Sequence, residues 1–479
     1  MTGRRTRDAI VVGSGPNGLG AAIALAQRGL DVLVVEGADT IGGGVRSAEL
    51  TLPGFTHDVC SSVYPMVLAT PFFRTLNLSV DWVHPPILAA HPLDDGTAAC
   101  LKQSIEDTAK GLDGDAEAYR RLIGPLAANA DALMADLVGP LRLPRHPRLA
   151  MRFGWPGLKS GRGFAEAYFR GEPARALWAG LAAHAVLPLE WRPGAAIALM
   201  LAIAGHAHGW PLAKGGAQNL SNALAAHFQS LGGTIETGHW IKTIEDLPPA
   251  KAILLDVSPR QAVALAGHRW PKRYVQGLTR YRHGPGVFKV DWALAGPIPW
   301  TAPECRTSGT VHLGGKLEEV ADMERAAFED RHVERPFVLL VQPSLFDPSR
   351  APAGQHTAWG YCHVPNGSTE DMTERIERQV ERFAPGFRDL ILARQAMNPA
   401  AMERYNPNYI GGDISGGIAD LTQLFARPVA RWNPYTTPER YLFLCSSSTP
   451  PGGGVHGLCG YFAAQAALRR VFRSVKQRQ

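Results

Sequence analysis

Residues 8–36, DAIVVGSGPNGLGAAIALAQRGLDVLVVE, constrain the fold of this chain more than any other segment. A short β-branched run leads into a G-x-G-x-x-G pattern, after which come a helical stretch and a second apolar run that ends in Glu36. Strand, glycine turn, helix, strand and acid in this order are typical of a βαβ unit that binds a dinucleotide. The glycines of the pattern are Gly13, Gly15 and Gly18.

Each part of this unit has a physical role in holding a dinucleotide. Gly13 permits the tight turn, Gly15 has no Cβ to keep a pyrophosphate off the backbone, and Gly18 lets the helix pack close to the strand. Pro16, between these glycines, is counted with the cofactor-binding residues. The N-terminus of the helix that follows offers N–H groups to the phosphates. Glu36 can accept hydrogen bonds from ribose hydroxyls. A βαβ unit without a nucleotide is the alternative, since glycine turns are common.

A second glycine turn follows Glu36 and extends the unit. Gly43 and Gly44 are followed by Arg46, and flexible backbone beside a cation suits the far side of a pyrophosphate. An ordinary turn with a solvent-exposed arginine fits the same residues equally well.

Bulk properties exclude several classes of protein. At 479 residues the chain is long enough for two domains. The formal net charge is +6, but no basic run carries interleaved aromatic residues, so nucleic acid is not an expected partner. The six cysteines form no C-x-x-C pair, which excludes the redox-disulfide motif and leaves no zinc spacing. We therefore expect no metal site.

No segment predicts export or a membrane span. The N-terminal MTGRRTR leads directly into the first strand and leaves no room for the apolar part of a signal peptide. The longest apolar run, residues 194–205, is shorter than the about 20 residues that cross a bilayer, and it predicts a core helix. We expect a cytoplasmic protein, while a peripheral membrane contact and a homodimer stay open.

Residues 139–162, GPLRLPRHPRLAMRFGWPGLKSGR, mix cations with apolar residues. We interpret the stretch as an exposed loop whose arginines lay their stems along the surface. Contact with a membrane surface or an acidic substrate is the alternative. The cations are Arg142, Arg145, Arg148, Arg152, Lys159 and Arg162.

A second glycine loop, STPPGGGVHG, lies near the C-terminus between the strand YLFLCSS and the helix YFAAQAALRRVF. Its glycines allow backbone N–H groups and a helix N-terminus to face an electron-rich group, such as the pyrimidine edge of a reduced flavin. The residues assigned to the cofactor here are Gly453, Gly454 and Val455. By itself, the loop is also compatible with a plain strand-to-helix turn.

Together these motifs resemble those of the phytoene-desaturase-related FAD oxidoreductases, in the flavin amine oxidase and glutathione reductase-like superfamily. Within that family, the chain looks most like the pyridine nucleotide-disulfide oxidoreductase domain-containing branch. The resemblance spans most of the chain and rests on VVGSGPNGL, DTIGGGVRS, PGFTHD, GGAQNLSNAL, PSLFDPSRAP, NYIGGDISGG and TPPGGGVHG. Many relatives carry a His-Pro pair before the C-terminal glycines, where this chain has Pro450 and Pro451.

The resemblance implies FAD as the cofactor and a backbone contact between its adenine and a strand at Ile241. It places the ADP half on Gly13, Gly15, Gly18 and Glu36, and Gly43, Arg46 and the C-terminal loop near the phosphates and flavin.

The order of helical and strand patterns predicts an α/β fold in which a Rossmann-like FAD-binding domain is interleaved with an α+β substrate domain. Residues 65–205 are expected to be helical, and residues 285–365 to alternate strands and turns. The FAD-binding domain is assigned to 1–65, 208–275 and 405–479. The substrate domain, a mixed sheet with a helical insert, is assigned to 66–207 and 276–404.

Two residues are candidates for chemistry. By analogy with flavin amine oxidases, Lys289 in VFKVDWALAG would hold a water or superoxide beside the flavin, and a strand lysine that faces the surface is the alternative. His456 in the glycine loop could contact the flavin or the substrate, or only cap the following helix. Tyr361, His312 and His363 are expected to pack or to line a site. No spacing supports a covalent flavin link through Cys60 or Cys459.

The expected activity is that of an FAD-dependent dehydrogenase, desaturase or oxidase that moves a hydride from a hydrophobic small molecule to flavin N5. Only one dinucleotide fingerprint is present, so oxygen, a quinone or another carrier is a more plausible acceptor than a pyridine nucleotide. One alternative is a non-redox double-bond isomerase that needs reduced FAD. The other is a flavoprotein with structural FAD that acts through a protein partner.

Overall fold

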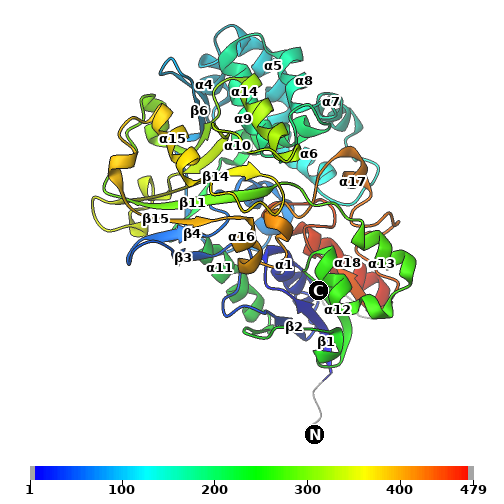
Figure 1. Cartoon of the computed structure of the whole chain (residues 1–479). Coiled ribbons are helices and arrows are strands. Elements are labelled where there is room, and N and C mark those ends of the chain that lie inside the picture. The colour runs from blue at the N-terminus through cyan, green and yellow to red at the C-terminus, as the bar shows by residue number, and fades with distance from the viewer. Residues whose placement is uncertain (1–5, 473–479) are drawn as a thin grey trace.

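The computed structural model describes residues 6–472, which are arranged around two β-sheets (Figure 1). The smaller sheet is parallel throughout and has the strand order β16 (Leu442–Leu444), β10 (Ala250–Leu255), β1 (Arg7–Val12), β2 (Val32–Val35) and β9 (Thr234–Glu236). Its inner strands read as unbroken apolar runs because both faces are buried.

Helices cover the two faces of this sheet. One face packs on α1 (Pro16–Ala26), α11 (Ala217–Ser230) and α18 (Leu458–Val471). The other packs on α12 (Pro259–Ala266) and α13 (Lys272–Thr279). Successive residues of β1 contact opposite layers, as the twofold repeat of a strand requires. The predicted Rossmann-like unit is confirmed.

The larger sheet is mixed and forms the second half of the fold. Its order is β15 (Ile391–Met397), β11 (Gly286–Leu294), β14 (His356–Val364), β13 (Val338–Val341), β12 (Ser308–Leu313), β6 (Ile87–Pro92) and β7 (Ala98–Leu101). Strands β12 and β6 are parallel, and the other neighbours are antiparallel. The predicted α/β class with a mixed second sheet is confirmed.

Two local predictions around this sheet are wrong. Residues 82–101 were expected to be helical but form β5 (Trp82–Val83), β6 and β7, because the D-D-G-T turn at 94–97 closes a hairpin between two buried runs. Residues 285–365 contain a helix, α14 (Leu317–Phe328), besides strands and turns.

The helical insert packs against one end of the larger sheet (Figure 1). Its helix α10 (Gly194–His208) is buried along most of its length, so the predicted core helix is confirmed. Of the helices in residues 6–472, none has both the length and the apolar character needed to cross a bilayer. The other helices of the insert are α2 (Pro65–Ala69), α3 (Pro71–Arg74), α4 (Ile105–Lys110), α5 (Ala116–Ala127), α6 (Ala130–Leu137), α7 (Pro147–Gly157), α8 (Gly161–Tyr168) and α9 (Glu172–Ala183).

The sequence suggested that residues 139–162 form an exposed loop. They instead contain α7 and the start of α8. Pro147 opens α7 at a position where its missing N–H costs nothing, and Phe153 anchors the helix by burying its ring. The remaining short elements are β3 (Ser47–Glu49), β4 (Thr56–Asp58), β8 (Leu212–Ala213), α15 (Thr373–Phe383), α16 (Pro399–Tyr405) and α17 (Leu421–Phe425).

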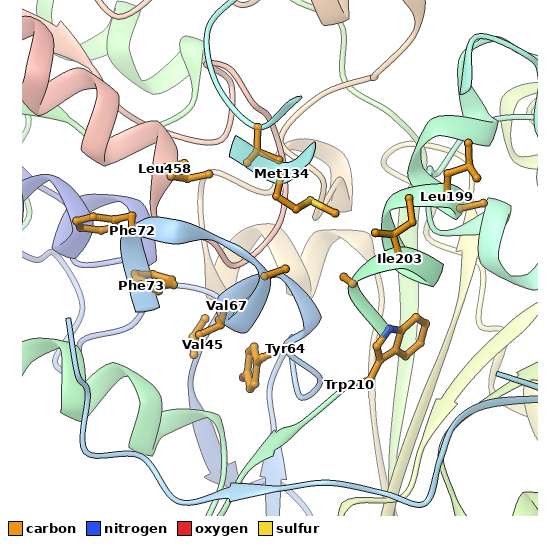
Figure 2. Close-up of a cluster of buried hydrophobic side chains, with 14 of the residues drawn as sticks. Val45, Tyr64, Val67, Phe72, Phe73, Met134, Leu199, Ile203, Trp210 and Leu458 are labelled. Carbon is orange, nitrogen blue, oxygen red and sulfur yellow. The ribbon is translucent and has the colours of Figure 1, made fainter. Parts of the chain in front are cut away.

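One hydrophobic core is continuous from the parallel sheet into the helical insert. Figure 2 shows Leu458 of α18 and Phe72 of α3 in the same cluster as Met134 of α6 and Ile203 of α10. Segments from both ends of the chain therefore share one core with the insert, and the boundaries proposed for two domains stay a prediction.

Candidate cofactor and substrate site

A cavity of about 930 Å³ opens at the carboxyl ends of the parallel strands and continues to the larger sheet. Ligands of open parallel sheets bind at this edge. Most of the residues that the sequence assigned to the cofactor or to catalysis line the cavity, whereas Gly18 of the first group and Lys289 of the second do not. Those that line it are Gly13, Gly15, Pro16, Glu36, Gly43, Gly44, Arg46, Ile241, Gly453, Gly454, Val455 and His456.

The two glycine loops meet because the helices that follow them cross at glycines. A Cβ built on Gly460 of α18 would lie 1.7 Å from the carbonyl oxygen of Asn17, and one on Gly20 would lie 2.7 Å from that of Gly457. Neither position has room for a side chain, so the backbones of α1 and α18 touch. This contact brings loops more than 400 residues apart in the sequence to one end of the cavity.

Asp256 forms the floor of the first glycine loop. Its Oδ2 accepts the N–H of Gly18 at 2.7 Å, and a Cβ on Gly15 would lie 3.0 Å from the same oxygen. Burial raises the pKa of Asp256 to about 7, although the Gly18 N–H lowers it, and the charge of Glu36 raises it further. The sequence analysis missed this residue, which directly follows the apolar run of β10.

Glu36 is held in place by backbone and hydroxyl donors. Its Oε2 accepts the N–H of Ser14 at 2.9 Å and the hydroxyl of Ser14 at 2.6 Å, and its Oε1 accepts the N–H of Ala38 at 2.9 Å. Arg46 Nη2 lies 3.7 Å from Oε1, and the guanidinium lies 5.4 Å from the centre of the Tyr405 ring. The acid and the cation predicted to flank a dinucleotide are therefore neighbours in the cavity wall.

Ile241 lines the cavity, but the prediction that it belongs to a strand is wrong. Strand β9 ends at Glu236, and the following residues turn at Gly238, whose φ of +73° cannot continue a sheet. The N–H of His239 then donates to the carbonyl of Glu36 at 2.9 Å, which ties this irregular segment across the end of β2.

His456 is bonded to the backbone of its own loop through both ring nitrogens. The N–H of Leu458 donates to Nδ1 at 3.1 Å, so Nε2 carries the proton and donates to the carbonyl of Gly452 at 3.1 Å. Burial lowers the pKa of His456 to about 4. This geometry favours the helix-capping alternative, and a catalytic role for His456 stays a prediction.

Lys289 is buried and paired with Asp291, two residues along the same face of β11. Its ammonium lies 5.0 Å from the centre of the Trp359 ring, which lines the cavity. Burial raises the pKa of Asp291 to about 6, although the charge of Lys289 lowers it. Lys289 thus reaches the cavity through Trp359, and the surface-facing alternative is wrong. Its water-holding role stays a prediction.

Aromatic and aliphatic side chains form the far end of the cavity. Trp359 and Tyr361 on β14 are stacked, with ring centres 6.0 Å apart and planes 12° from parallel. Tyr361 lines the cavity, as the sequence suggested, whereas His312 and His363 do not. The helix α10 adds Ile197, Met200 and Leu201 to the same wall.

Cys60 and Tyr409 are further wall residues without an assigned role in the sequence analysis. Tyr409 Oη donates to Cys60 Sγ at 3.5 Å, and burial raises the pKa of both groups. Tyr409 lies in NYIGGDISGG, a segment that carried the family resemblance, so its motif was visible although its place was not. Cys459 is also buried, and its thiol donates to the carbonyl of Thr449 at 3.4 Å.

Known proteins resemble the N-terminal segment and the whole chain. Residues 11–76 match the family model of the NAD(P)-binding Rossmann-like domain. The chain is 26% identical to pyridine nucleotide-disulfide oxidoreductase domain-containing protein 2 of Rattus norvegicus, over 98% of the chain and 94% of that protein. It is 24% identical to the all-trans-zeta-carotene desaturase of Myxococcus xanthus, over 84% of the chain and 81% of that protein.

A solved structure shares the fold. An oxidoreductase from Methanosarcina mazei superimposes with a TM-score of 0.65 at 16% identity, covering 96% of this chain and 99% of that chain.

Proposed function

We propose that this chain, which is similar to the phytoene-desaturase-related FAD-dependent oxidoreductases, oxidises a hydrophobic small molecule by hydride transfer to flavin N5. Oxygen, a quinone or another carrier is the proposed acceptor. One observation carries the proposal: a single cavity joins two glycine loops to an aromatic and aliphatic wall.

The residues at the glycine end fit FAD, the cofactor of this family. A Cβ on Gly43 would lie 3.1 Å from Cα of Gly15, so side chains at these positions would fill the space between the first glycine loop and the turn at Gly43. The Oδ1 atom of Asn17, at the start of α1, is buried and has no hydrogen-bond partner among residues 6–472. Gly15 and the N-terminus of α1 would hold the pyrophosphate, Glu36 the ribose, and Gly453 to Val455 the flavin.

When bound, FAD supplies the hydride acceptor. The chain would position the substrate and exclude water from it. The stacked rings of Trp359 and Tyr361 present a flat apolar surface that would hold the substrate and exclude water. Burial keeps the thiol of Cys60 and the phenol of Tyr361 protonated by raising their pKa, and it lowers the pKa of His184 to about 4. These wall groups are neutral at pH 7, which suits an uncharged substrate, such as a hydrocarbon or the deprotonated form of an amine.

Anaerobic mixing of the yellow protein with candidate substrates tests the proposal. A polyene hydrocarbon and a hydrophobic primary amine are the first probes, with flavin absorbance and product mass as readouts. We expect one class to bleach the flavin band and to yield a dehydrogenated product. Trp359→Leu should slow bleaching, whereas Trp191→Leu, outside the cavity wall, should not.

Three other results would contradict the proposal. Turnover only after reduction with dithionite, without net oxidation, indicates the isomerase. A flavin that neither bleaches nor exchanges indicates a structural cofactor. An apoprotein without affinity for FAD excludes all three functions.

A further inference from the structure

The outward side of α7 and the segment before it carry apolar side chains that the fold leaves in solvent. Trp155 is 77% exposed and Leu143 is 91% exposed, although burying either side chain would be favourable. Met151 and Trp155 of α7 and Leu158 at its C-terminal cap follow each other at helical spacing, while Phe153 points inward. We call this surface the α7 face; its exposed apolar residues are Leu141, Leu143, Met151, Trp155 and Leu158, at 73, 91, 68, 77 and 50%.

Cations alternate with these apolar residues, and no acid balances them. The sequence has no Asp or Glu between Asp136 and Glu166. Asp136 itself turns inward and accepts the backbone N–H groups of Arg145 and His146 at 3.1 and 2.8 Å. Within residues 6–472, no ion pair engages the four exposed arginines of the α7 face, which are Arg142, Arg145, Arg148 and Arg152.

We propose that the α7 face docks on a membrane surface that contains anionic phospholipid. An amphipathic helix with Trp and Leu among cations lies at the boundary between headgroups and acyl chains, where the apolar side chains enter the bilayer and the cations meet phosphates. The opposite charges of the arginines and the phosphates attract each other. A second copy is a poorer occupant, because a twofold contact would bring the four arginines of each copy together.

The α7 face also adjoins the cavity. Val138, which lines the cavity, lies only three residues before Leu141 of that face. A protein docked through this face would therefore hold one wall of its cavity beside the bilayer. That position suits an apolar ligand that is dissolved in lipid, but the docking itself does not depend on the proposed oxidation.

Flotation of the purified full-length protein with vesicles tests the proposal. Phosphatidylcholine vesicles are compared with vesicles that also contain phosphatidylglycerol, at low and at high salt. We expect binding to the anionic vesicles only, weakened by salt because the attraction is screened. The doubly substituted variants Met151→Ser with Trp155→Ser, and Arg148→Gln with Arg152→Gln, should each lower the partition coefficient by roughly tenfold or more.

Matched controls separate docking from general surface effects. Leu392→Ser and Arg378→Gln change exposed residues of other elements, β15 and α15, and should bind as the unchanged protein does. Thermal melting of each variant verifies that it is folded. The proposal is wrong if the unchanged protein does not float at low salt, or if folded α7 variants bind normally. It is also wrong if the protein does not bind vesicles but forms a dimer, and if the double variant Met151→Ser with Trp155→Ser is a monomer.

Discussion

Gly460 of α18 faces the carbonyl oxygen of Asn17 so closely that a Cβ on Gly460 would lie 1.7 Å from that oxygen. Asn17 belongs to the first turn of α1, directly after the first glycine loop. The packing of these two backbones therefore decides where the second glycine loop stands relative to the first.

Gly460→Ala should force α1 and α18 apart, because the clash is with backbone rather than with a flexible side chain. We expect a loss of about 2–4 kcal/mol in the free energy of unfolding and a larger loss of FAD occupancy. Thermal melting and the ratio of flavin to protein absorbance measure both. Gly124→Ala in α5 is the control, because nothing lies within 4 Å of its Cβ, and it should leave FAD occupancy unchanged. Normal flavin content in Gly460→Ala would show that the crossing does not position the loops.

Glu36→Ala should give colourless or weakly yellow protein. The substitution removes the acceptor for Ser14 and Ala38 and the proposed partner of the ribose. An affinity loss of about 1.5–3 kcal/mol is expected for a hydrogen bond to a charged group. Fluorescence titration of the apoprotein with FAD measures it, with Glu36→Gln as the variant of similar shape and an intermediate loss. Full FAD occupancy in Glu36→Ala would show that the dinucleotide motif is misread.

The stability of the apoprotein should carry a pH dependence from Asp256. Its folded-state pKa is raised to about 7 from 3.8, so between these values the folded chain holds a proton that the unfolded chain has lost. The stabilisation from this group is complete below pH 3.8 and disappears as pH rises through 7. Asp256→Asn resembles the protonated form and does not titrate. Its free energy of unfolding should therefore rise relative to that of the unchanged protein as the pH is raised from 5 to 8.5. A difference in melting temperature that stays constant over this range would contradict the assignment.

Lys289→Met should destabilise the fold by about 3–5 kcal/mol, because it removes the cationic partner of the buried Asp291 carboxyl and leaves only the imidazole of His57, whose Nδ1 lies 3.5 Å from Oδ1. Adding Asp291→Asn should recover much of this loss. Chemical unfolding of both single variants and the double variant gives the coupling between the two residues. If Lys289 acts only through the packing of Trp359, the double variant should also recover most of the rate of flavin reduction. A stable double variant with no flavin reduction would instead favour a direct role beside the flavin.

The parts of the site that the sequence predicted are those whose function depends on local backbone conformation. A glycine turn between a strand and a helix lets a ligand approach the backbone at the end of the strand. Residues such as Gly13 and Gly453 could therefore be placed in the cavity wall from the sequence. Asp256 could not, since nothing in LLDVSP tells that its carboxylate lies under the first loop.

The rest depends on register and long-range packing. Whether Lys289 meets the cavity directly or through Trp359 depends on strand pairing that sequence periodicity does not give. The hairpin of β6 and β7, at 87–101, was missed because it lies in a region expected to be helical, although D-D-G-T was a recognisable turn. In α14, the apolar positions of LEEVADMERAAF have helical spacing and could have been recognised.

The contact between α1 and α18 also sets the order in which the protein can become functional. Strand β16 and the second glycine loop lie in the last 40 residues, whereas the first loop is among the first 20. A chain emerging from the ribosome folds its N-terminal segments first. Here those segments supply only the first of the two glycine loops of the proposed FAD site. Loading with FAD must therefore wait until the chain has been synthesised through β16 and the second glycine loop, and fragments that end before β16 would carry an open, cofactor-free site.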